Sequence, residues 1–246
     1  MPVGYVLNSA LFNSVEVAYN VFETFRGGEA AYIYGRLLAT LRFLFLADTF
    51  TIYPYQLGGE GNQEGLKSGA WWFYQKLGFR PRDRGTQKLM RRELARLRQN
   101  PHYRSSIAIL KQLAAENVYL DLGRPREDVI GQLPLPEIGL QITAYVSQRF
   151  GSERNLAPRV CGREAQKMLG LNNLNGFSSG EKLAWQRWSP LILILPGVGK
   201  WPMAAKQALI QVVRAKGGRR ELDFALAFDG HLPLRRALVK LARGGP

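Results

Sequence analysis

The first eighty residues alternate between strand-like and helix-like patterns of apolar positions. Residues 2–10 and 15–25 alternate apolar and polar side chains and are separated by a short connection at 11–14 that contains Asn13, so they predict a β-hairpin. In the second of these strands one face carries the apolar side chains Val15, Val17, Tyr19 and Val21. That face is therefore expected to pack against a core.

A helix and a second strand-helix unit follow the hairpin. Apolar residues three and four positions apart predict a helix over residues 29–47. A β-rich run at 49–55 comes next, and a glycine-rich loop at 58–62 separates it from a short aromatic helix at 64–76. Gly78 is the expected C-terminal stop of that helix, and residues 79–81 begin an edge strand.

Beyond residue 86 the pattern is mostly helical. It contains one short strand-like run at 118–122, a proline-containing linker near 123–136, and helical segments at 86–100, 104–115, 138–150, 160–169, 203–216 and 233–242. We therefore predict an α/β (α+β) fold, in which a partial mixed sheet with flanking helices is followed by a mostly α-helical C-terminal region. The expected divisions are residues 1–85, 86–164 and 165–246.

Composition excludes several kinds of site. The chain has one cysteine, Cys161, and two histidines, His102 and His231, so an intrachain disulfide is excluded and no metal site is expected. No apolar run approaches the ~20 residues of a membrane span, and residues 1–5 lack the basic and apolar regions of a signal peptide. A cytoplasmic protein without a membrane span is expected.

The net charge of +15 is concentrated in two segments. Residues 80–104 carry nine Lys/Arg against two acids, and residues 181–246 carry twelve against four. Such segments suit nucleic acid, acidic lipid or a polyphosphate ligand. The alternative is that they are solvated helix faces.

Two short motifs carry the most specific chemical signal. A β-patterned run ends in Arg26-Gly27-Gly28, and the predicted helix begins directly after this basic turn. About forty-four residues later the aromatic helix ends in Tyr-Gln-Lys-Leu-Gly-Phe at residues 74–79. A basic glycine turn before a helix presents backbone N–H groups and a helix N-terminus to a phosphate.

Together and in this order, the two motifs resemble the acyl-CoA-binding half of the GNAT acyltransferase superfamily. The resemblance covers residues 1 to about 82, without the strand and two helices that open such a domain. It implies acetyl-CoA or another acyl-CoA as co-substrate and an amine of unknown identity as acceptor. The cofactor-binding residues that it implies are Val21, Phe22, Arg26, Gly27, Gly28, Glu29, Ala30 and Ala31.

The resemblance also implies catalytic roles. Tyr74 corresponds to the tyrosine that protonates the departing thiolate, and a tyrosine of ordinary pKa is protonated at neutral pH as that role requires. Glu23 is the preferred base, ahead of Glu16, because it interrupts an otherwise apolar strand face. Two positions depart from the family pattern: Glu29 stands where the turn signature has glycine, and Lys67 stands where the family often has asparagine.

A second motif indicates a different class of function. Residues 195–200, Leu-Pro-Gly-Val-Gly-Lys, resemble the hairpin of helix-hairpin-helix DNA-binding modules, in which a glycine turn exposes N–H groups to a phosphate. Pro190, Ile192 and Ile194 weaken the helix expected before it.

The predicted function is transfer of an acyl group from acyl-CoA to an amine, in a domain that is active, truncated or degenerate. The alternatives are a non-enzymatic nucleic-acid binder and an inactive GNAT fold used for interactions.

Overall fold

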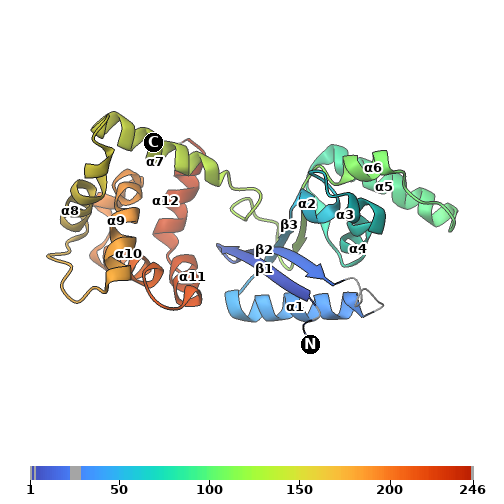
Figure 1. Cartoon of the computed structure of the whole chain (residues 1–246), viewed down its shortest axis with the longest axis horizontal. Coiled ribbons are helices and arrows are strands. Elements are labelled where there is room, and N and C mark those ends of the chain that lie inside the picture. The colour runs from blue at the N-terminus through green and yellow to red at the C-terminus, as the bar shows by residue number, and fades with distance from the viewer. Residues whose placement is uncertain (1, 3, 23–28, 245–246) are drawn as a thin grey trace. The chain divides into compact units, whose positions relative to one another are not determined.

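The chain divides into two compact units, Met1–Gly131 and Gln132–Pro246 (Figure 1). They are seen in a computed structural model that describes residues 2, 4–22 and 29–244. The first unit contains a mixed sheet with helices around it, and the second is helical. The predicted α+β class with a helical C-terminal region is therefore confirmed.

A five-stranded sheet organises the first unit. Its strands are β1 (Gly4–Leu11), β2 (Ser14–Val21), β3 (Thr49–Ile52), β4 (Arg80–Pro81) and β5 (Val118–Asp121), and they lie in the order β1-β2-β3-β5-β4. β2 and β3 are parallel, and the other neighbours are antiparallel. Phe12 and Asn13 have φ values of 50° and 59°, the left-handed geometry that joins two strands through a two-residue turn. The predicted hairpin is confirmed, with β2 ending at Val21.

Six helices complete the first unit within its described residues. They are α1 (Ala30–Phe45), α2 (Pro54–Leu57), α3 (Gln63–Ser68), α4 (Ala70–Lys76), α5 (Arg84–Gln99) and α6 (Ile107–Leu113). The single aromatic helix predicted at 64–76 is wrong: Gly69, with φ of +67°, separates α3 from α4. This backbone conformation strains a residue that has a Cβ and suits glycine.

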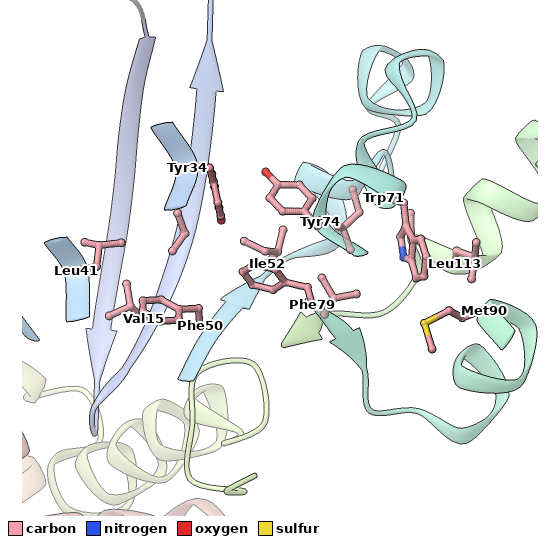
Figure 2. Close-up of a cluster of buried hydrophobic side chains, with 14 of the residues drawn as sticks. Val15, Tyr34, Leu41, Phe50, Ile52, Trp71, Tyr74, Phe79, Met90 and Leu113 are labelled. Carbon is pink, nitrogen blue, oxygen red and sulfur yellow. The ribbon is translucent and has the colours of Figure 1, made fainter. Parts of the chain in front are cut away.

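The aromatic helix α4 ends in a way that explains its Leu-Gly-Phe sequence. The N–H of Phe79 donates to the Tyr74 carbonyl at 3.1 Å, and the N–H of Gly78 donates to the Gln75 carbonyl at 3.1 Å. These paired bonds form a Schellman motif, which needs a left-handed residue at its centre, and Gly78 has φ of +106°. Phe79 is then fully buried in the core together with Tyr34, Ile52, Trp71 and Tyr74 (Figure 2).

The segment 118–131 completes the sheet, although it lies far from the other strands in the sequence. β5 inserts between β3 and β4, and the backbone of Ile130 then bonds both central strands. Its N–H donates to Ser14 Oγ at 2.9 Å, and its carbonyl accepts from Thr51 Oγ1 at 2.9 Å. The boundary between the compact units therefore does not lie at the predicted residue 85, because residues 86–131 belong to the sheet-containing unit.

The second unit contains six α-helices in its described residues. They are α7 (Leu135–Phe150), α8 (Ala157–Leu169), α9 (Ser179–Ile194), α10 (Met203–Lys216), α11 (Glu221–Asp229) and α12 (Leu232–Ala242), and no strand is found there in residues 132–244. The predicted division at residues 164 and 165 falls inside α8. In the whole described part of the chain, no helix is both long enough and apolar enough to cross a membrane.

Candidate functional site

The two parallel strands at the centre of the sheet separate after a short common stretch. β2 and β3 are paired at three positions, from Ser14 with Thr49 to Glu16 with Thr51. β3 then ends at Ile52 and turns into α2, whereas β2 continues to Val21 beside β1. Among the described residues, no strand pairs with this side of β2 beyond Glu16.

A pocket of about 520 Å³ lies where these strands separate. β1, β2, α1, α2, α3 and α4 contribute to it, so it is built entirely within the first unit. Its lining consists of Tyr5, Leu7, Ala18, Tyr19, Asn20, Val21, Ala30, Tyr55, Gln56, Asn62, Glu64, Gly65, Ser68, Ala70, Phe73 and Tyr74. Among the residues that the structure describes, this lining is aromatic, aliphatic, small or neutral polar apart from one carboxylate, Glu64.

The backbone of β2 presents its peptide groups to this pocket in a regular pattern. In an antiparallel pair, alternate residues bond the neighbouring strand and the others point to the opposite edge. The N–H of Tyr19 donates to Gln56 Oε1 of α2 at 3.3 Å, which places it on the edge away from β1. Val17 and Val21 lie two positions away on either side and turn their peptide groups to the same edge. An extended ligand with amide groups can pair with this edge.

Tyr74 of α4 lies in the wall of this pocket. It is 4% exposed, and its ring packs against Tyr34 of α1 and Phe79, with centroid separations of 5.6 and 5.8 Å (Figure 2). Burial, followed by the neighbouring Tyr19, raises the pKa of Tyr74 well above its ordinary value. Tyr74 therefore stays protonated at neutral pH and can act as a proton donor but not as a base.

The predicted cofactor-binding residues fall partly inside the described structure. Val21 and Ala30 line the pocket, and Phe22, which follows Val21 in the chain, is exposed. Glu29 is exposed at the N-terminus of α1 and makes no capping hydrogen bond with its side chain, and Ala31 is also exposed. Glu23, Arg26, Gly27 and Gly28 lie outside the described residues.

A carboxylate on β2 lies where β2 and β3 begin to separate. Glu16 is half-buried and pairs with Thr51 in the last row shared by β2 and β3. Burial is the largest cause that raises the pKa of Tyr53, and the charge of Glu16 is the second. Glu16 points to the same face of β2 as Ala18 and Asn20, which line the pocket.

Several pocket residues were not singled out from the sequence. Gln56 and Tyr55 come from α2, a four-residue helix that starts at Pro54. Asn62 caps α3 by accepting from the N–H of Gly65 at 3.0 Å, and its amide donates to the Tyr55 carbonyl at 2.7 Å. The Pro-Tyr-Gln sequence signals a turn, but its place beside β2 depends on where β3 ends.

The basic C-terminal segment has a different arrangement. A turn joins α9 to α10, with Val198 buried and both Gly199 and Lys200 exposed. Three cations on and after α10 have acidic partners in the same unit: Arg214 with Glu181 at 2.9 Å, Lys216 with Glu221 at 2.5 Å, and Arg220 with Asp223 at 3.7 Å. The charges of these three side chains are therefore balanced within the unit, and the segment as a whole keeps an excess of positive charge.

Residues 2, 4–22 and 29–244 contain no group of three or more His, Cys, Asp or Glu side chains placed to hold a metal ion. Comparisons of the chain with protein-family models, with curated proteins and with solved structures found no match.

Proposed function

We propose that the first unit binds an acyl-CoA in the pocket beside β2 and transfers its acyl group to an amine. The observation that carries this proposal is the separation of the two parallel strands around a pocket of about 520 Å³, with Tyr74 in its wall. The separation leaves an edge of β2 that no strand of the described residues pairs with, and an amide-bearing arm can lie along it. The N-terminus of α1, at Ala30, opens onto the same pocket and suits a phosphate.

In this proposal the backbone does most of the binding. The Tyr19 N–H bonds an amide carbonyl of the pantetheine arm along the β2 edge, in place of its bond to Gln56 Oε1. The sequence resemblance assigns the pyrophosphate to residues 26–31, of which the structure describes 29–31. Glu29 opposes this binding because a carboxylate repels the phosphates, although its side chain is exposed and can turn toward solvent.

The chemical step is direct attack of the amine nitrogen on the thioester carbonyl carbon. A new C–N bond forms, the C–S bond breaks, and the sulfur leaves with the electron pair. Tyr74 O–H donates a proton to that sulfur. A carboxylate accepts the proton lost by the amine: Glu23 is preferred from the sequence, and Glu16 of β2 is the candidate among the described residues.

The first experiment is a thermal-unfolding titration of the whole chain with acetyl-CoA and with CoA. Binding to the folded state raises the unfolding midpoint with ligand concentration. We expect a rise for the wild type and a larger rise for Glu29→Gly, because the variant removes a repelling charge. The absence of a rise in both proteins would overturn the proposal.

Tyr74→Phe separates binding from catalysis. We expect the variant to keep its response to CoA and to lose about 10²–10⁴-fold in acyl transfer in an amine-acceptor screen, the range typical of a lost general acid. Glu16→Gln tests the choice of base in the same assay. A Tyr74→Phe enzyme with normal turnover would exclude Tyr74 as the acid.

A second candidate function is nucleic-acid binding by the turn between α9 and α10. Its support is the exposure of Gly199 and Lys200 beside the buried anchor Val198. We expect Lys200→Glu to weaken binding of a labelled DNA duplex, and to lower the salt dependence of that binding by about one unit per lost phosphate contact. Equal binding by the variant and the wild type would refute this candidate.

A further inference from the structure

Three tyrosines from three different elements meet at the inner wall of the pocket. We name Tyr19 of β2, Tyr34 of α1 and Tyr74 of α4 the tyrosine cluster. The ring of Tyr34 contacts the other two, with centroid separations of 5.1 Å to Tyr19 and 5.6 Å to Tyr74. Tyr19 and Tyr74 line the pocket, and Tyr34 is fully buried in contact with both. Figure 2 shows Tyr34 beside Tyr74.

Two of these hydroxyl groups are buried without a partner. Neither Tyr19 Oη nor Tyr34 Oη has a hydrogen-bond partner within the part of the chain that the structure describes. A buried hydroxyl in this state lowers stability, because it loses water and gains no replacement. Phenylalanine would fill the same aromatic packing without that penalty. The hydroxyl groups therefore require an explanation other than packing.

We propose that the tyrosine cluster is a binding site for the thioester end of the ligand, and that Tyr19 and Tyr34 are additional positioning residues there. This inference rests on the proposed function. Tyr19 lines the pocket, so its O–H donates a hydrogen bond to the thioester; Tyr34 lies behind the lining, and its O–H donates to the oxygen of Tyr74 in the ligand-bound state. Entry of the ligand thus satisfies groups that are unpartnered in the free protein.

The chemistry of the cluster fits a thioester better than a charged group. Burial is the largest cause that raises the pKa of Tyr34 and of Tyr74, so both remain donors at neutral pH. The cluster itself contains neither a cation to hold a phosphate nor a carboxylate to hold an ammonium. Sulfur makes favourable contacts with aromatic rings, and the negative charge that develops on the departing sulfur is stabilised by fixed O–H dipoles.

The test compares single hydroxyl deletions with a matched control. Tyr34→Phe and Tyr19→Phe remove unpartnered hydroxyls, whereas Tyr119→Phe removes a buried hydroxyl that donates to the Gly131 carbonyl at 3.0 Å. Thermal unfolding is measured without ligand and with acetyl-CoA. We expect Tyr34→Phe and Tyr19→Phe to raise the midpoint without ligand and to weaken acetyl-CoA binding about tenfold. Tyr119→Phe should lower the midpoint and leave acetyl-CoA binding unchanged.

The outcomes separate this inference from the proposed function. If the wild type responds to acetyl-CoA and the Tyr34→Phe and Tyr19→Phe variants bind it equally well, the role of the cluster is wrong and the proposed function stands. A lower midpoint of Tyr34→Phe without ligand would also overturn the inference, because the hydroxyl would then have a structural partner. If the wild type does not respond to acetyl-CoA, the proposed function fails and the inference fails with it.

Discussion

Glu93 provides a demanding test of the energetics of the first unit. It lies on the basic helix α5, yet its side chain is 0% exposed. One carboxylate oxygen accepts from Tyr103 Oη at 2.7 Å and from Ser105 Oγ at 2.8 Å, and the other accepts from Arg96 Nη1 at 3.0 Å. These bonds hold the chain after α5 against the helix.

The size of the effect follows from these contacts. A hydrogen bond to a charged group contributes about 1.5–3 kcal/mol, but Tyr103 and Ser105 are only partly buried and regain water when the acid is removed. The ion pair with Arg96, which is 48% exposed, adds little. We expect Glu93→Ala to lower the free energy of unfolding by about 2–4 kcal/mol and Glu93→Gln by about 1–2 kcal/mol.

The same contacts predict how the effect depends on pH. Burial acts to raise the pKa of Glu93, but the hydrogen bonds from Tyr103 and Ser105 and the charge of Arg96 outweigh it, so the pKa is lowered. A carboxyl group whose pKa is lower in the folded state stabilises the protein above its unfolded pKa, and this contribution is lost as the pH falls through the folded value. The difference between wild type and Glu93→Gln should shrink below about pH 4.

Urea denaturation combined with peptide-resolved hydrogen exchange assigns the loss to the first unit. Glu116, an exposed acid in the same unit, gives the matched control, and Glu116→Ala should change stability by less than about 0.5 kcal/mol. A loss below about 1 kcal/mol for Glu93→Ala, or a difference between Glu93→Gln and wild type that is constant from pH 7 to pH 3, would refute this reasoning.

Three further variants test other parts of the structure. Gln56→Ala should lower stability by no more than about 1 kcal/mol because its bond to the Tyr19 N–H is long, and should tighten CoA binding by freeing that N–H; weaker binding in the titration would contradict this. His231→Ala should destabilise the second unit by about 1–3 kcal/mol in urea denaturation, since His231 Nε2 bonds the Ala205 carbonyl at 2.9 Å. Gly131→Ala should lower the unfolding midpoint, because φ is +84° and a Cβ would lie 2.6 Å from an amide nitrogen; an unchanged midpoint would show that the turn relaxes.

Local signals were sufficient for much of the fold. The alternation around Asn13, the left-handed stop at Gly78 and the helical spacing from Met203 to Lys216 each depend on neighbours within a few residues. The hairpin, the end of α4 and the bounds of α10 could therefore be read from the sequence. The single helix predicted at 64–76 is wrong because Gly69 takes a left-handed conformation and separates α3 from α4.

Pro190 shows packing overriding a local preference. The sequence favoured a weakened helix there, yet α9 continues from Ser179 to Ile194. Pro190 and Ile192 are both buried, and Trp185 anchors the helix by donating from Nε1 to the Gly162 carbonyl at 3.1 Å. The apolar surface buried by this packing offsets the hydrogen bond that proline removes.

Local motifs indicated some residues of the candidate site, and only the tertiary structure showed the others. The family resemblance of two local motifs, a helix stop and a glycine-rich turn, implied Tyr74, Val21 and Ala30 as site residues. Tertiary structure decided that these residues line one pocket, and it added Tyr19 and Gln56 to them. That outcome depends on β3 leaving β2 after three paired positions and on β5 inserting from residue 118. Contacts between distant segments set both features, and no short stretch of sequence encodes them.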